Sequence, residues 1–236
     1  MRSWILALGL LLGCNKDTRV EELEIDGDVN SLLVKSGKGE INLTPSEDGK
    51  VRVTATLVCK NTKWSYTLKD GELTLKKRCR FLHLSPCWVD FSIEAPPQVV
   101  ADLRAGDGDV SVTDWEGPVA ITSDEGAIDV AGLAGELDVV TDQGVVTGTE
   151  LFCPDIAIDG GSGAVSLDVV DDGFAQIAVD NGAGDVEIYL PTNGTYNVET
   201  DTNKGAIYLR DVYTSSESDH LVTVETSSGD ITIAGQ

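Results

Sequence analysis

The stretch Ser123-Asp-Glu-Gly-Ala-Ile-Asp-Val130 decides the fold, because seven copies of its pattern fill the second part of the chain. Each copy places a glycine in a polar turn and then alternates apolar with polar residues. These glycines are Gly108, Gly126, Gly144, Gly163, Gly184, Gly205 and Gly229, at spacings of 18, 18, 19, 21, 21 and 24 residues. An eighth copy, Ser36 to Leu43, stands alone near the start. Regular self-similarity at this period indicates a repeat architecture.

Each repeat contains two short segments of strict alternation. In the quoted repeat, Val119 and Ile121 precede the glycine, and Ile128 and Val130 follow it. Such alternation predicts strands with one buried face, and no window has helical spacing. The near-constant spacing favours an all-β fold, a parallel β-solenoid (β-helix-like), in which each repeat is one coil. The alternative is an antiparallel β-sandwich, in which each glycine turn is a hairpin loop.

Residues 50–94 have a different pattern. Val51 to Val58, Trp64 to Leu68 and Glu72 to Lys76 read as an N-terminal β-meander, with Asp70-Gly71 as a hairpin turn. We expect this meander to cover the open end of the solenoid, where strand edges and core would otherwise be exposed.

The first residues carry a targeting pattern. Arg2 precedes the apolar run from Trp4 to Leu12, which is too short to span a bilayer, and the run closes with Leu11-Leu12-Gly13-Cys14. This ending resembles the bacterial lipobox, which implies cleavage before Cys14 and acylation of its sulfur. The expected location is the bacterial cell envelope, lipid-anchored, and Asn15 favours the outer membrane.

Four segments are predicted from these patterns. Their boundaries are a signal peptide at 1–13, a lipidated tether at 14–22, the first repeat with the basic meander and a cysteine-bearing insert at 23–97, and an acidic glycine-turn repeat domain at 98–236.

Cysteine usage agrees with an oxidising compartment. Beyond Cys14, the chain contains Cys59, Cys79, Cys87 and Cys153, an even set that predicts two disulfides. Three pairings are possible, and the sequence does not choose among them. A zinc site is disfavoured, because the chain offers no paired CxxC motif and only two histidines.

Charge is concentrated in the second part. Residues 98–236 hold three basic residues against 27 acidic ones, a net charge of −24. Such a surface excludes nucleic acid as a partner and suits cations or basic partners, while turn capping and solubility are the simpler explanation. Calcium is the one metal considered, with weak candidate ligands at Asp107, Asp109, Asp124 and Asp185.

Catalytic motifs are missing from the sequence. Only His83 and His220 are available as imidazole bases, and no phosphate-binding glycine loop occurs. Acids in successive repeats are the remaining possibility, because stacked carboxylates on a β-helix would suit a carbohydrate-active enzyme. These acids are Asp129, Asp138, Asp159 and Asp168. Aromatic residues that would stack on a sugar are scattered, so no enzyme, no catalytic residue and no cofactor is predicted.

Basic residues cluster in the meander, around Trp64 and Tyr66. They are Lys60, Lys63, Lys69, Lys76, Lys77, Arg78 and Arg80. They predict either a solvated strand face with lysines guarding an edge, or a surface that rests on anionic lipid.

The order of these elements resembles the putative-adhesin domains of bacterial envelope proteins, including the head domain of the GIN type. The resemblance rests on Ser36 to Leu43, Val51 to Leu75, Ala95-Pro-Pro97 and the repeats from Gly106 onward. It implies a β-helical, non-enzymatic module that binds an unknown surface or envelope ligand or serves a structural role. A divalent-cation-binding surface module is the alternative. The insert from Cys79 to Cys87 departs from the family pattern.

Overall fold

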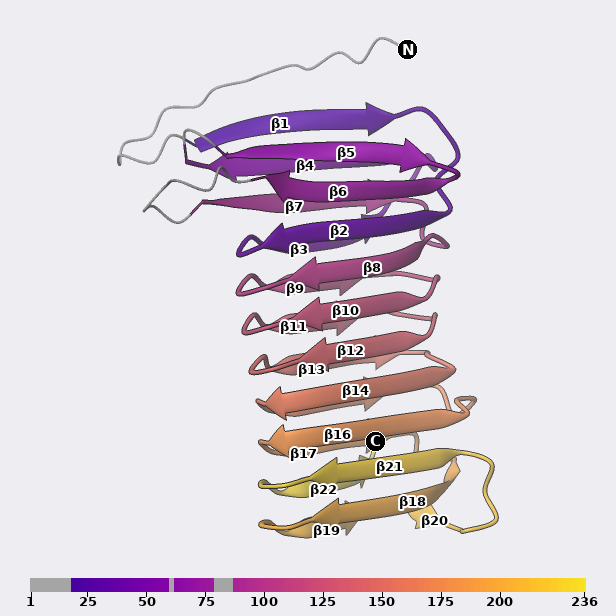
Figure 1. Cartoon of the computed structure of the whole chain (residues 1–236). Coiled ribbons are helices and arrows are strands. Elements are labelled where there is room, and N and C mark those ends of the chain that lie inside the picture. The colour runs from indigo at the N-terminus through magenta and orange to yellow at the C-terminus, as the bar shows by residue number, and fades with distance from the viewer. Residues whose placement is uncertain (1–17, 60–61, 79–86) are drawn as a thin grey trace.

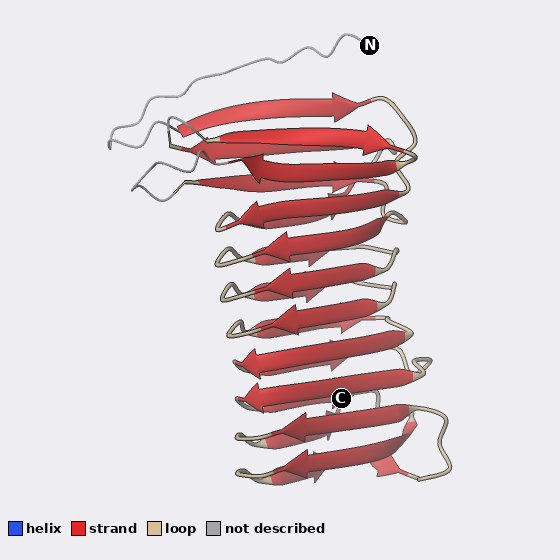
Figure 2. Ribbon diagram, in the orientation of Figure 1, coloured by secondary structure: helices blue, strands red, loops and turns tan. Residues whose placement is uncertain are grey.

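The computed structural model describes residues 18–59, 62–78 and 87–236. These residues form 22 strands and no helix, arranged in two 11-stranded sheets that lie face to face (Figure 1, Figure 2). In order, sheet A contains β1 (Thr18–Ile25), β4 (Val51–Val58), β7 (Trp88–Ala95), β3 (Ile41–Pro45), β9 (Val110–Thr113), β11 (Ile128–Ala131), β13 (Val146–Leu151), β15 (Val165–Val169), β17 (Val186–Leu190), β22 (Ile231–Gly235) and β19 (Ile207–Arg210). Sheet B contains β20 (Tyr213–Thr214), β18 (Thr195–Thr202), β21 (Leu221–Thr226), β16 (Gln176–Ala183), β14 (Asp155–Ser162), β12 (Leu137–Thr141), β10 (Val119–Ser123), β8 (Val100–Ala105), β2 (Ser31–Gly37), β6 (Glu72–Arg78) and β5 (Lys63–Lys69).

The repeats form parallel coils, which confirms the predicted β-solenoid. A coil consists of one strand of sheet B, a glycine turn and one strand of sheet A, as in β10 and β11. Equivalent residues of successive coils pair in register, for example Val119 with Leu137 and Ile128 with Val146. The antiparallel sandwich is therefore wrong for the repeats, because all their strand pairs in the described chain are parallel.

The core is a continuous stack of aliphatic side chains between the two sheets. Alternate residues of each strand point inward, and side chains such as Val112, Val130 and Val139 are at most 1% exposed. Each coil buries its apolar face against both neighbours, so stability grows with the number of coils rather than residing in one.

The repeat glycines form a column along one corner of the solenoid. A Cβ atom placed on any of the seven repeat glycines would lie 1.8–2.3 Å from the carbonyl oxygen of the neighbouring glycine in the column. In spatial order the column contains Gly39, Gly108, Gly126, Gly144, Gly163, Gly184, Gly229 and Gly205. The coils approach too closely here for any side chain, which explains why glycine recurs at this position.

A buried polar column runs beside the glycines. In most coils the residue three positions before the column glycine is Ser, Thr or Asn, and its side chain bonds the turn backbone. The Ser36 hydroxyl donates to the Gly39 carbonyl at 2.7 Å, and the Asn181 amide donates to the Gly163 carbonyl at 3.0 Å. These bonds satisfy backbone groups that the tight corner would otherwise leave unpaired.

The meander covers the N-terminal end of the solenoid, as predicted (Figure 1). Strands β1 and β4 extend sheet A antiparallel to β7, and the β5–β6 hairpin extends sheet B beyond β2. The hairpin turn is Asp70-Gly71, with φ values of 52° and 81°. Strand β1 begins at Thr18, so residues 18–22 of the predicted tether pair with β4 instead.

The coils do not stack in sequence order at the far end. Strand β21 lies between β16 and β18, and β22 lies between β17 and β19. The coil of residues 221–235 is therefore inserted between the coil of residues 176–190 and the coil of residues 195–210 (Figure 1). The loop of residues 211–220 makes this return possible. His220 anchors the loop, with its ring edge against Phe174 and Tyr196 and its Nδ1 2.6 Å from the Phe174 carbonyl oxygen.

Candidate binding face

Several predicted sites cannot be placed. Cys14, Cys79 and His83 lie outside the described residues, so acylation stays a prediction. Cys59 and Cys87 flank the Val58–Trp88 pair of strands β4 and β7.

Cys153 contradicts the expectation of two disulfides. It is a free thiol, 1% exposed, that donates to the Leu133 carbonyl at 3.6 Å. Burial in the apolar core raises the pKa of this thiol to about 12. Its side chain thus serves as a core residue, as buried cysteines commonly do.

The four calcium candidates lie in or beside the turns, where most of them already make hydrogen bonds or ion pairs. Asp109 accepts a hydrogen bond from the Ala127 backbone N–H at 2.8 Å, and Asp185 accepts one from Asp230 at 2.9 Å. Asp107 pairs with Lys38, and Asp124 lies exposed in its turn. In the described part of the chain, no group of three or more His, Cys, Asp or Glu side chains is arranged to hold a metal ion. Calcium binding stays a prediction.

The four acids considered for a glycosidase are not stacked. Asp129 and Asp168 are on sheet A, whereas Asp138 and Asp159 are on sheet B. Within each sheet the two acids also sit at different register positions, since Asp138 pairs with Ala157 and Asp129 with Thr147. The stacking of these four acids that a glycosidase would need does not occur.

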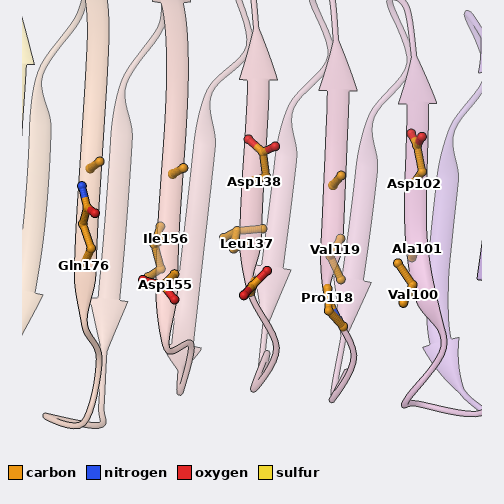
Figure 3. A pocket seen from close by; sticks show the side chains of 14 residues that line it. Val100, Ala101, Asp102, Pro118, Val119, Leu137, Asp138, Asp155, Ile156 and Gln176 are labelled. Carbon is orange, nitrogen blue, oxygen red and sulfur yellow. The ribbon is translucent and has the colours of Figure 1, made fainter.

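A groove crosses the outer face of sheet B from β8 to β16 (Figure 3). Its volume is about 550 Å³, and its side chains come from β8, β10, β12, β14 and β16 and the residues directly before them. Figure 3 shows them side by side on neighbouring strands. The lining residues are Val100, Ala101, Asp102, Pro118, Val119, Ala120, Glu136, Leu137, Asp138, Asp155, Ile156, Ala157, Gln176 and Ala178. Small and aliphatic side chains form much of the surface, and four carboxylates are spread along it.

Beside the groove, one row of outward-facing residues crosses ten of the 11 strands of sheet B. We call it the outer row. From β18 to β5 it reads Asp201, Glu225, Asp180, Asp159, Val140, Thr122, Arg104, Lys35, Lys76 and Ser65. Four acids occupy one half and three bases the other, with two uncharged residues in the middle and the uncharged Ser65 at the basic end.

Sequence reasoning missed this row, although its signal is simple. From Lys35 to Asp201, the member in each glycine-turn coil lies four residues before the column glycine. Aligning the coils on their glycines would have revealed the change from basic to acidic residues along the solenoid.

Together, the parallel coils, the glycine column and the covered N-terminal end define a β-solenoid repeat protein with a grooved, charged outer face. The chain belongs to the Toastrack DUF4097 family, whose sequence model matches residues 26–234. This confirms the repeat fold.

Similar solved structures come from Clostridium sporogenes and Parabacteroides merdae. A putative cell adhesion protein from Clostridium sporogenes is 15% identical with a TM-score of 0.38, and the match covers 92% of this chain and 100% of that one. A putative adhesin from Parabacteroides merdae is 12% identical with a TM-score of 0.38, over 93% and 96% of the two chains. At these TM-scores the likenesses add nothing to the family assignment. No curated protein matches the chain.

None of the described residues belongs to a helix long and apolar enough to cross a membrane.

Proposed function

We propose that this chain is a non-enzymatic, adhesin-like binding module, anchored in the bacterial envelope through Cys14 and binding its ligand on the outer face of sheet B. The composition of the groove carries the proposal. Its lining, within the described chain, contains no histidine, serine, cysteine or aromatic residue. It therefore offers no hydroxyl or thiol nucleophile, no imidazole base and no ring for stacking on a sugar, whereas its aliphatic surface and carboxylates suit a binding contact.

The rigidity of the face supports the same function. Groove residues stand on strands that are hydrogen-bonded on both sides, and the side chains beneath them, such as Leu103 and Val139, are fully buried. A site on such strands is preorganised and loses little conformational entropy on binding.

The anchor is tested by replacing the cysteine. The Cys14→Ala variant should move from the membrane fraction to the soluble fraction and lose incorporation of radiolabelled palmitate. Cys153→Ala is the matched control, because its thiol is buried in the core, and this variant should stay in the membrane fraction. A Cys14→Ala variant that remains labelled and membrane-bound would refute the anchor.

The binding face is tested by filling the groove. Ala157 is exposed on β14, so Ala157→Trp occupies the groove without entering the core. We expect the full chain carrying it to bind isolated envelope fragments of the source bacterium at least tenfold more weakly than the unaltered chain. The control is Ala131→Trp on sheet A, which should bind normally. Equal binding by both variants would exclude the groove as the contact.

A further inference from the structure

We propose that the partner of this face is a second copy of the same chain, packed on it with the coils in the opposite order. The inference rests on the proposed function in taking the outer face of sheet B as the binding face, and the placement of the pair between two membranes rests on the proposed anchor. It is carried by the charge pattern of the outer row, which is complementary to its own reverse.

The charged residues of the outer row are available for a partner. Asp159, Asp180, Glu225 and Asp201 are all exposed. In the described part of the chain, Arg104 is the one row member with an ion-pair partner, Asp102 at 2.6 Å. Like charges on adjacent strands repel one another, and this repulsion destabilises both halves of the row. An approaching opposite charge would therefore lower the electrostatic energy of each half.

A two-fold axis parallel to the strands, between β10 and β12, brings the halves together. Rotation about this axis keeps the strand direction and reverses the coil order. Strands at equal distances on the two sides of the axis then face each other, one from each copy. Three oppositely charged pairs result, and each occurs twice because the axis relates the two copies. The pairs are Arg104 with Asp159, Lys35 with Asp180 and Lys76 with Glu225 of the second copy. Val140 meets Thr122 at the centre, where neither carries a charge.

The row two residues earlier along each strand avoids conflict in the same arrangement. Asp102 falls opposite Ala157 of the second copy, and Asp138 falls opposite Ala120. Alanines at these positions also allow two sheets to approach to the usual spacing of about 10 Å. Packing with the coils in the same order would instead place acid on acid along half of the row, which like-charge repulsion opposes.

The reversed coil order determines how two anchored chains must be placed to form the pair. The two N-terminal ends lie at opposite ends of such a pair. Given the anchor of the proposed function, the contact joins chains held on two facing membranes rather than neighbours on one membrane.

Carbodiimide cross-linking tests the pairing directly, because it joins an amine to a carboxylate only when the two are in contact. Within one chain, Lys35 and Asp180 are five strand spacings apart, about 24 Å. Lys76 and Glu225 are seven spacings apart, about 34 Å. A link of either kind must therefore join two copies. We expect both links by mass spectrometry of the full chain in nonionic detergent, together with a dimer whose yield falls as salt is added.

Charge reversal makes the test specific. The basic-half variant, Lys35→Glu with Lys76→Glu, and the acidic-half variant, Asp180→Lys with Glu225→Lys, should each lose at least nine-tenths of the cross-linked dimer. When the two variants are mixed, every reversed pair is again opposite in sign, and the dimer should return. A misfolded variant would not recover in the mixture, so recovery separates lost complementarity from lost structure.

Two control variants carry the same charge changes elsewhere. Lys50→Glu with Lys204→Glu, and Asp129→Lys with Glu187→Lys, lie off the outer face of sheet B and should leave the dimer intact. A monomeric unaltered chain with neither link, or a dimer that survives in both half-row variants, would overturn the proposal. If that chain still binds envelope fragments through the groove, the proposed function stands and the partner is a different molecule.

Discussion

Replacing Gly126 with alanine should destabilise the whole solenoid corner. The new Cβ would lie 2.0 Å from the Gly108 carbonyl oxygen and 2.4 Å from its carbon, about 1 Å short of the closest approach that real Cβ atoms make. The coils must therefore separate at the glycine corner. This separation would stretch the backbone hydrogen bonds on either side of Gly126, which join Val110 to Ala127 and Ile128 to Val145, each at 2.9 Å.

The expected loss follows from these contacts. Overpacking in a tight site costs about 1–3 kcal/mol, and each weakened backbone bond costs about 1 kcal/mol. We therefore expect the free energy of unfolding to fall by about 3 kcal/mol, measured by urea denaturation followed by circular dichroism. Gly173→Ala is the control, because its Cβ would meet only the flexible Asp171 carboxylate at 3.3 Å. A Gly126→Ala variant within about 0.5 kcal/mol of the unaltered chain would show that the column does not require glycine.

Three further residues and one ion give sharp expectations. Asn181→Leu removes the donor to the Gly163 carbonyl and should lower the unfolding free energy by about 1–3 kcal/mol; an unchanged urea midpoint would contradict this. Cys153 should resist a thiol reagent at pH 8 until urea unfolds the chain, because burial raises its pKa to about 12, and rapid labelling of the folded chain would disagree. Burial also raises the pKa of Tyr196 to about 12 from 10.0, so the unfolded chain releases this proton first and stability should fall between pH 10 and 12. Tyr196→Phe should reduce that fall, and an identical pH profile would exclude Tyr196 as its source. Calcium at 1 mM, on the order of the weak-site range, should raise the melting temperature relative to chelator if the turn acids bind it; identical melting curves would end the calcium hypothesis.

The local fold could be predicted because each repeat contains, within its own sequence, the residues that define its strands and turn. A polar turn, a glycine and alternating apolar residues suffice to define a coil, and Asp70-Gly71 suffices to define the hairpin of the cap. The same logic explains the failure at the far end. Asn181, Thr202 and Thr226 occupy equivalent places in equivalent motifs, so nothing local distinguishes which coil neighbours which.

The site was harder to predict, because it depends on register between coils. Cysteine parity suggested two disulfides, whereas Cys153 follows β13 into the core, where only the packed coils determine its surroundings. Asp129 and Asp138 looked equivalent in the sequence, yet they fall on opposite sheets. The charge pattern of the outer row was recognised only from the strand pairs of the structure.

The inserted coil has a consequence for how such a rod can change its length. The outermost coil, residues 195–210, is internal to the chain, and the coil that follows it in the sequence already has neighbours on both sides. A repeat appended after residue 235 would find no vacant edge beside its own predecessor. Duplication within residues 106–190 meets no such obstacle, because each new coil would pair with the copy before it and the copy after it. Rods of different lengths in this family should therefore differ by insertions in the middle of the solenoid, with the closing pair of coils retained as a unit.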